Sequence, residues 1–312
     1  MSYTKLSITT ANGVGYLMLD SGGRFNTLSI GTLREISAAF KELSADPAAT
    51  VIVISGFPGE SFAVGANIAE MLEFSPGDAL AFADVGQALF EMMEDADKPV
   101  IAALNGITMG GGCDLSLACD LRLASDSLRV AHPGARLGIL TGFCGTQKLP
   151  RLIGRGRALE VFMTAATYNA ADALAMGYVS RVFPQETFWQ EVTAFAEALA
   201  QRPVELLATA KTLVNCAEDV ELKSGCALER ASYVARKKGS SGDSGGTQVN
   251  PPRPLTGGEQ GGGDAAICCN GGTFPPTLSL PRKGGGDVSA ASSPKTASIL
   301  TKGATATKGT IS

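Results

Sequence analysis

The chain has 312 residues, of which 45% are hydrophobic and 18% charged, a balance typical of a globular protein with a sizeable core. The net charge of −4 argues against nucleic acid as a partner, and no apolar run approaches the ~20 residues that span a membrane. The first ten residues, MSYTKLSITT, lack the pattern of a secretory signal, so we expect a cytoplasmic protein.

The cysteines fit the same compartment. Five of them stand in apolar or glycine-rich surroundings and are predicted to be small buried thiols of a reducing environment: Cys113, Cys119, Cys144, Cys216 and Cys226. The remaining pair is adjacent in sequence, which is not the spacing of metal ligands, so we expect no metal site.

Apolar periodicity predicts alternating strands and helices over the first half of the chain. Strands are expected at 13–20, after an Asn-Gly turn, and at 50–56, 98–106, 120–126 and 127–133. Helices are expected at 31–43 and 78–95, and residues 147–235 are mainly helical in pattern. Short strands between helices predict an α/β core with a helical C-terminal part.

Residues 105–114 read NGITMGGGCD, and this run of glycine leads directly into a helical pattern. A helix N-terminus carries free N–H groups and a partial positive charge, and glycine lets a reacting group approach them. The run therefore suits a developing oxyanion, while a phosphate cradle or a close-packed turn remains the alternative. The dinucleotide and phosphate-loop glycine patterns both fail here. A second glycine turn, SFAVGANIAEM at 61–71, could aim another N–H group at the same oxygen.

Four segments carry a resemblance to a known family: SFAVGANIAEM, NGITMGGGCDLSLACDLRLAS, HPGARLGILTGFCGTQKLPRLIGRGRALE and YNAADALAMGYVSRVF. In this order and spacing they resemble the crotonase, or enoyl-CoA hydratase/isomerase, superfamily from about Tyr3 to Ala235. The resemblance implies a spiral of ββα units over about 1–195 and a helical trimerisation part over about 196–238. It also implies a homotrimer or a dimer of trimers.

The resemblance further implies a coenzyme A thioester as substrate and no separate cofactor. The thioester oxygen would lie between the amides of Ala66 and Gly111, and Asp114 would supply a catalytic carboxylate. The substrate would contact residues of the same motifs and Arg24, in the turn before the first long helix: Arg24, Ala63, Gly65, Ala66, Asn67, Ile68, Gly110, Gly111, Pro133, Thr141 and Gly142.

The sequence departs from the hydratase pattern at its two acids. Hydratases of this family carry a glutamate at the position of Asp114 and a second one at the position of Gly134. The first acid is therefore one methylene shorter here, and the second is missing. His132, the only histidine of the chain, precedes Gly134 by two residues and points the same way in an extended segment. It is a candidate acid or base, with a hydrogen-bonded structural histidine as the alternative.

The leading functional hypothesis is hydration of a 2-enoyl-CoA. Double-bond isomerisation and decarboxylation of an acyl-CoA are the enzymatic alternatives, because each needs fewer acid and base groups. A catalytically impaired binder of CoA thioesters is the alternative from a different class. The basic side chains of the late helices are expected to form a solvated face, or else to meet coenzyme phosphates: Lys211, Lys223, Arg236, Lys237 and Lys238.

Residues 239–312 differ in composition from the first 238. They are rich in Gly, Ser, Pro and Thr with few aromatics, which predicts a disordered tail. A functional linker is one interpretation. We hypothesise instead that the tail is out-of-frame or read-through translation, which an intact mass of native protein matching all 312 residues would contradict. The tail replaces the usual closing helix of the family, so we expect a partly open coenzyme pocket and a weakened oligomer.

Overall fold

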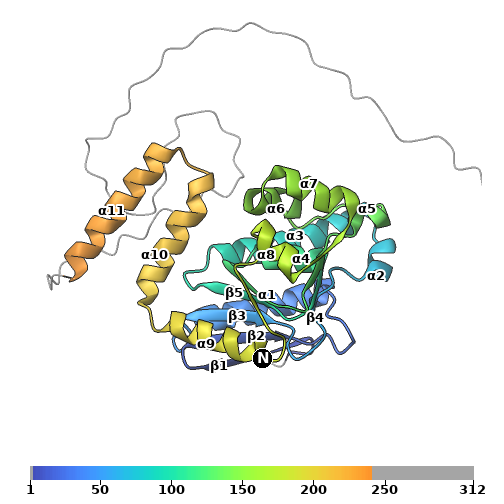
Figure 1. The fold of residues 1–312 in the computed structure, drawn as a ribbon, viewed down its shortest axis with the longest axis horizontal. Coiled ribbons are helices and arrows are strands. Elements are labelled where there is room, and N and C mark those ends of the chain that lie inside the picture. The colour runs from blue at the N-terminus through green and yellow to red at the C-terminus, as the bar shows by residue number, and fades with distance from the viewer. Residues whose placement is uncertain (1–2, 241–312) are drawn as a thin grey trace, which may run out of the picture. The chain divides into compact units, whose positions relative to one another are not determined.

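The computed structural model describes residues 3–240 (Figure 1). Within this range, six strands form the larger sheet in the order β1–β2–β3–β5–β7–β10. Their bounds are β1 Leu6–Ala11, β2 Val14–Leu19, β3 Val51–Ser55, β5 Val100–Leu104, β7 Leu121–Ser125 and β10 Arg181–Phe183. β1 and β2 form an antiparallel hairpin, and every other neighbouring pair in this sheet is parallel.

The hairpin turn forms where the sequence predicts it. Asn12 and Gly13 both have positive φ, 52° and 82°, and Ala11 pairs with Val14 across the turn. Two central residues of positive φ match the twist of a two-residue hairpin, which is why Asn-Gly is favoured there.

A smaller sheet of four described strands has the order β4–β6–β8–β9. Its strands are β4 Ser61–Ala63, β6 Ile107–Met109, β8 Arg129–Ala131 and β9 Thr167–Asn169. The first three run parallel to one another, and β9 is antiparallel to β8. The chain therefore crosses from the larger sheet to the smaller one after β3, β5 and β7.

Helices cover both faces of the larger sheet. Two of the longer helices begin at capping residues: Ser29 accepts a hydrogen bond from the Thr32 amide, and Ser75 forms a capping box with Asp78. The helices of the N-terminal part are α1 Ile30–Ala45, α2 Ile68–Leu72, α3 Pro76–Glu94, α4 Gly111–Leu117, α5 Gly134–Leu137, α6 Gly145–Ile153, α7 Arg155–Thr164 and α8 Ala170–Met176. The later elements are α9 Phe188–Ala200, α10 Val204–Asn215, the 3₁₀ turn Cys216–Glu218 and α11 Leu222–Ser240.

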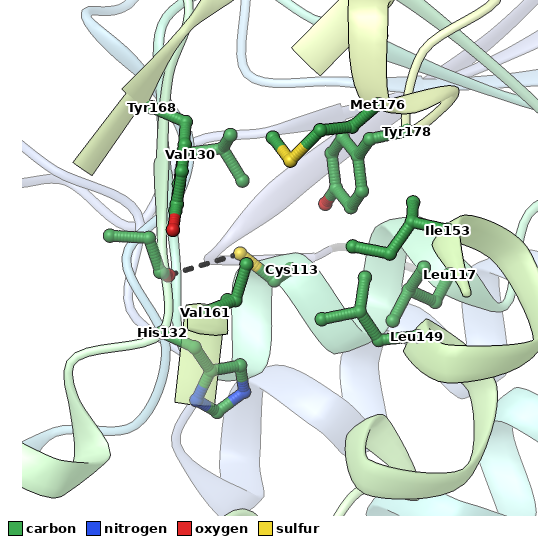
Figure 2. Close-up of a pocket in the computed structure, with 11 residues that line it drawn as sticks. Cys113, Leu117, Val130, His132, Leu149, Ile153, Val161, Tyr168, Met176 and Tyr178 are labelled. Atoms are coloured by element: carbon green, nitrogen blue, oxygen red, sulfur yellow. Dashed lines mark hydrogen bonds between the residues drawn. The ribbon is translucent and has the colours of Figure 1, made fainter. Parts of the chain in front are cut away.

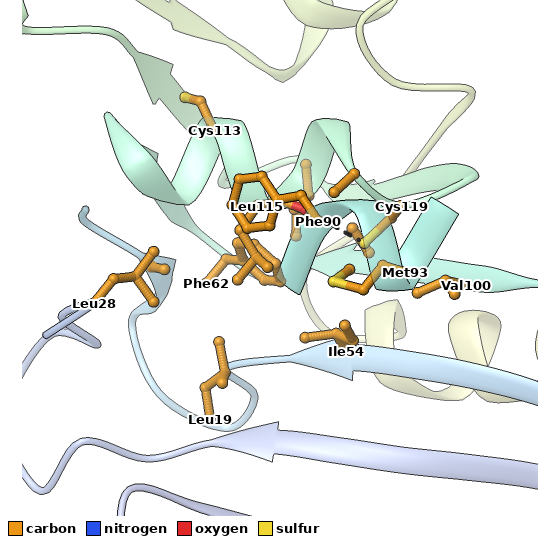
Figure 3. Close-up of a cluster of buried hydrophobic side chains, with 14 of the residues drawn as sticks. Leu19, Leu28, Ile54, Phe62, Phe90, Met93, Val100, Cys113, Leu115 and Cys119 are labelled. Carbon is orange, nitrogen blue, oxygen red and sulfur yellow. Dashed lines mark hydrogen bonds between the residues drawn. The ribbon is translucent and has the colours of Figure 1, made fainter. Parts of the chain in front are cut away.

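The central strands are buried on both faces, which explains their continuous apolar runs. On one face, alternate residues such as Ile54 pack with Phe90 and Met93 of α3 and Leu115 of α4 (Figure 3). On the other face, residues such as Val53 pack against α9. Burying side chains of this size contributes roughly 1.5–3 kcal/mol each, so the two cores hold the strand ends in fixed positions.

The sequence predictions for this part are confirmed in outline. The helices expected at 31–43 and 78–95 correspond to α1 and α3, and the expected strands correspond to β2, β3, β5, β7 and β8. Of the five cysteines predicted to be buried, Cys113, Cys119 and Cys216 are buried. Cys144 is only partly buried, and Cys226 is exposed on the solvent-facing side of α11, so these two predictions are wrong. The predicted tail lies outside the described residues from position 241 onward.

Candidate active site

Three turns meet at one edge of the smaller sheet. β4, β6 and β8 are parallel neighbours, so their carboxyl ends lie side by side. The chain leaves these ends through Gly65–Ala66, Gly110–Gly111 and His132. The pairing of these strands thus brings the first turn next to the second, about 45 residues later in the sequence, and the second next to the third, about 20 residues later.

The first turn is fixed by backbone hydrogen bonds. The Leu28 amide donates to the Gly65 carbonyl at 2.8 Å, and the Val64 amide donates to the Asn26 carbonyl at 2.8 Å. Gly65 has φ +86°, a conformation that favours glycine. A Cβ atom at Gly65 would lie 2.8 Å from the amide nitrogen of Gly111, so the two glycine turns are in direct contact.

The three glycines of the second turn are bare for three different reasons. Gly110 has φ +51° at the start of α4. A Cβ atom at Gly111 would lie 3.2 Å from the Phe143 ring, and one at Gly112 would lie 2.0 Å from the Ala63 carbonyl oxygen. Glycine is therefore favoured at Gly110 by the backbone conformation, at Gly111 by the close Phe143 ring, and at Gly112 by the Ala63 carbonyl oxygen.

This arrangement leaves two amides available. Among residues 3–240, neither Ala66 nor Gly111 donates a backbone hydrogen bond from its N–H group. Gly111 is the first residue of α4, so its N–H group has no acceptor inside the helix. Both residues are partly exposed, so an oxygen from outside the protein can approach them.

Asp114, one turn further along α4, is completely buried with 0% of its surface exposed. Its Oδ2 accepts a hydrogen bond of 2.5 Å from the Thr141 hydroxyl, and its Oδ1 lies 3.2 Å from Nε2 of His132. A Cβ atom at Gly145 would lie 2.0 Å from Oδ1, so only glycine leaves room for the carboxylate. The structure thus brings Asp114, His132 and Thr141 together in one polar cluster.

His132 is 5% exposed and stacks obliquely on Phe162, with ring centroids 4.7 Å apart. It stands at one end of a cavity of about 20 Å³ with both ring nitrogens directed away from the apolar side chains (Figure 2). A cavity of this size holds no more than a water-sized group, so it is not an acyl pocket.

Position 134 carries no side chain, and the space beside it is filled. Gly134 begins α5, and a Cβ atom there would lie 2.5 Å from the Ile139 carbonyl oxygen. The Ile139 amide donates back to the Gly134 carbonyl at 3.0 Å, which closes the segment over this position. The backbone of residues 134–139 therefore fills the space that the side chain of a second acid would need.

The other predicted substrate contacts lie around this cluster or at the surface. Asn67 caps α2 by accepting from the Ala69 amide, and Ile68 beside it is 41% exposed. The Gly142 carbonyl accepts a hydrogen bond from Gln87. The Arg24 side chain is 71% exposed; it pairs with Glu60 at 3.0 Å and lies over the Phe25 ring, 5.0 Å from the ring centroid.

Two contributors to the site escaped the sequence analysis. Phe143 packs against both Gly111 and Gly86, and Gly145 makes space for the Asp114 carboxylate. The sequence signal was the string TGFCGTQ, whose glycine and aromatic residues could have been assigned to the site.

Cys113 lies beside Asp114, and burial raises the pKa of its thiol well above the usual range. Its Sγ donates to the carbonyl oxygens of Ala131 and Thr108, so it is a structural thiol and not a nucleophile. In the described part of the chain, no three His, Cys, Asp or Glu side chains group as metal ligands. No described helix is long and apolar enough to cross a membrane.

The chain is similar to a known family and to several known proteins. Residues 9–244 match the family model for enoyl-CoA hydratase/isomerase. The chain is 33% identical to the crotonyl-CoA hydratase of Syntrophomonas wolfei over 233 residues, which is 75% of this chain and 90% of that protein. It is 32% identical to a short-chain-enoyl-CoA hydratase of Clostridium acetobutylicum over 67% of this chain and 80% of that protein.

The crystal structure of an enoyl-CoA hydratase from Bacillus anthracis covers 76% of this chain and 95% of its own, with 31% identity and a TM-score of 0.71. The predicted crotonase-type α/β fold is therefore confirmed. By sequence and by fold together, the chain belongs to the enoyl-CoA hydratase/isomerase family.

Proposed function

We propose that this protein is an enoyl-CoA hydratase-like enzyme that adds water to a 2-enoyl-CoA thioester. One observation carries the proposal: the amides of Ala66 and Gly111 are unpaired within the described chain and stand on turns that touch. The names of its relatives support an acyl-CoA thioester as the substrate.

The two amides would receive the thioester oxygen. Water addition at the β-carbon moves charge onto this oxygen, and preorganised donors stabilise the resulting enolate more than the ground state. Removing one such donor costs about 2.7–4 kcal/mol of barrier stabilisation. Asp114, together with the residues that hydrogen-bond to it, is the centre of the acid/base chemistry, since protons must be taken and returned beside the enolate.

Isomerisation of the double bond is the second candidate function. It is favoured by the backbone that fills position 134, because the described site then offers only one carboxylate, that of Asp114. A single acid/base centre can move a proton between two carbons, whereas hydration gains from a second group that activates water. Losing such a group typically costs ~10²–10⁴-fold in rate.

A substrate panel separates the candidates. The protein would be incubated with crotonyl-CoA, a 3-enoyl-CoA and a malonyl-type thioester. Loss of the conjugated absorbance marks hydration, its appearance marks isomerisation, and carbon dioxide marks decarboxylation. The Asp114→Asn variant is expected to lose at least ~10²-fold in the reaction observed. Tight thioester binding without any turnover would refute the enzymatic proposal and leave a binding protein.

A further inference from the structure

The carboxylate of Asp114 is sealed from outside the protein. It has 0% exposed surface, and Thr141, His132 and the backbone of Gly145 surround its oxygens. Thr141 is held in turn, because its hydroxyl accepts a hydrogen bond of 3.1 Å from the Phe143 amide. In this arrangement the carboxylate presents no free oxygen to a substrate.

His132 is the neighbour through which this carboxylate can act. Its Nε2 faces Asp114, and a carboxylate can only accept hydrogen bonds, so the neutral ring carries its proton on Nε2. Nδ1 is then a bare lone pair, and it has no hydrogen-bond partner among the described residues. In residues 3–236, the fully buried polar side-chain atoms without a hydrogen-bond partner are Ser44 Oγ and Arg236 Nε. Since Nδ1 has no partner and is not one of these two atoms, part of its surface is exposed.

The backbone of His132 leaves the smaller sheet next to the Gly111 amide. The Gly110 amide donates to the Ala131 carbonyl at 3.0 Å, which places the next residues of the two segments, Gly111 and His132, at the same strand ends. On the other side, the place of a Cβ atom on Gly134 is 4.0 Å from Nδ1. Gly134 therefore places no side chain against Nδ1, and the atom that lies nearest to this Cβ place is the Ile139 carbonyl oxygen, at 2.5 Å.

We propose that Nδ1 of His132 is the atom that exchanges protons with the thioester, and that Asp114 is a positioning residue that holds the ring. This inference rests on the proposed function and specifies which atom performs its acid/base step. The proposed roles are those known from other Asp–His pairs, in which a buried carboxylate fixes the tautomer of the histidine and stabilises the imidazolium that forms.

The proton balance is simple. In hydration, the oxygen of water bonds to the β-carbon while one of its O–H bonds breaks. The proton goes to Nδ1, and the electron pair of the double bond becomes the enolate, whose oxygen accepts from the Ala66 and Gly111 amides. The imidazolium keeps its Nε2–H bond to Asp114, so the charges remain paired. Return of the Nδ1 proton to carbon regenerates the neutral ring, and no further reactant is required.

The tautomer can be measured directly, because His132 is the only histidine of the chain. An untagged protein labelled with ¹⁵N-histidine would give the signals of one ring in an NMR spectrum. We expect the neutral ring to carry its proton on Nε2 and none on Nδ1. A ring protonated on Nδ1 alone would overturn the proposal.

The chemistry can be measured with a saturated thioester. Butyryl-CoA in D₂O reports abstraction of the proton next to the carbonyl, without hydration, as deuterium incorporation seen by mass spectrometry. His132→Gln can still donate a hydrogen bond toward Asp114 but has no basic nitrogen. We expect its exchange rate to fall by ~10²–10⁴-fold with an unchanged Kd for butyryl-CoA. Tyr168→Phe, at the same cavity, is the control and should exchange as the wild type does.

A second variant guards against misfolding of the first. In His132→Ala, added imidazole should restore exchange, because it can occupy the vacated space as a free base. Wild-type exchange in His132→Gln together with its loss in Asp114→Asn would show that Asp114 is the base, which overturns this proposal and leaves the proposed function intact. No exchange by a wild-type protein that hydrates crotonyl-CoA would also overturn this proposal, whereas no turnover of any thioester of the panel would refute the proposed function itself.

Discussion

Gly65 and Gly22 adopt similar left-handed backbone conformations, with φ of +86° and +74°, but their surroundings differ. A Cβ atom at Gly65 would lie 2.8 Å from the Gly111 amide nitrogen, whereas one at Gly22 would meet nothing within 4 Å. At Gly22, glycine is therefore needed only for its backbone conformation. At Gly65, it is also needed because a side chain would lie against the Gly111 amide.

Gly65→Ala tests the amide pair. The new methyl group would lie 2.8 Å from the Gly111 amide nitrogen and displace it, so we expect kcat to fall by ~10²–10³-fold, the usual effect of losing one such donor. Kinetics on the best substrate of the panel would measure it, with Gly22→Ala as the control for backbone strain. Equal losses of kcat in the two variants would mean that strain, and not access to the amide, controls the rate.

Sequence reasoning found Asp114 and His132 separately, but it did not find their contact. The Asp114–His132 pair depends on the register of β8 against β6, and the Asp114–Thr141 bond depends on the path of a loop 27 residues away. Neither register nor loop path is encoded in local periodicity, whereas the glycine turns are, because glycine marks a local backbone requirement.

At the scale of elements, Glu35 ties α1 to the start of the chain. Its carboxylate accepts from the Thr4 hydroxyl at 2.6 Å and from the amides of Thr4 and Lys5. The hydrogen bond from the Thr4 hydroxyl is the main cause that lowers the pKa of Glu35. A lowered folded pKa means that the charged form is stabilised by folding.

This contact predicts a pH-dependent contribution to stability. The contribution is fully present above the unfolded pKa of about 4.3 and is lost as the pH falls through the lower folded value. Glu35→Gln should therefore unfold at lower urea than the wild type at pH 7, and the difference should shrink between pH 5 and pH 3. Glu229→Gln, an exposed glutamate of α11, serves as control. A Glu35→Gln difference that stays constant with pH would contradict the assignment.

The helix α10 is attached to the core by a buried charge. Lys211, expected on a solvated face, is instead 6% exposed at its side chain and pairs with Asp120 at 3.0 Å. Its Nζ also donates to the carbonyl of Met93 at 2.8 Å. The prediction was wrong because the long apolar stem of a lysine can cross a helix interface and deliver its charge to a buried acid.

Lys211→Met should be strongly destabilising. It leaves the Asp120 carboxylate, whose pKa burial already raises, without its cation. Breaking a buried pair in this way costs about 3–5 kcal/mol, and the 17% exposure of Asp120 favours the lower end. Urea unfolding would measure it against Lys223→Met, which removes an exposed lysine of α11. A loss below about 1 kcal/mol would show that the pair adds little.

Longer elements were predictable and short ones were not. α1 and α3 span 16 and 19 residues with repeated apolar spacing and capping serines. β10, of three residues, carries too few positions for a period to appear, and it was placed within a helical region. Its strand conformation comes from pairing with β7, which is a tertiary contact.

At the scale of the whole molecule, the C-terminal helices expose apolar side chains. In the described part, large hydrophobic residues of α10 and α11 are between 48% and 80% exposed: Leu206, Val214, Leu222, Tyr233 and Val234. A contiguous exposed apolar surface is typical of an interface. Assembly of this region into a trimer or a dimer of trimers stays a prediction.

The double substitution Val214→Lys and Leu222→Lys should reduce assembly. Sedimentation velocity at micromolar concentration is expected to show a shift toward the monomer, because two charges would have to be desolvated in the interface. Lys223→Glu, a charge change at an exposed position of the same helix, should leave the distribution unchanged. An unaltered distribution in the double variant would place the interface elsewhere.

The closed segment at Gly134 has a consequence for how this protein could change over time. A Gly134→Glu exchange would not simply return a second acid to the site, because the first carbon of the new side chain would collide with the Ile139 carbonyl. The loop would have to be rebuilt first. A single substitution at position 134 therefore cannot introduce a working second acid. Substitutions around His132 that preserve this loop are more accessible to evolution than a glutamate at position 134.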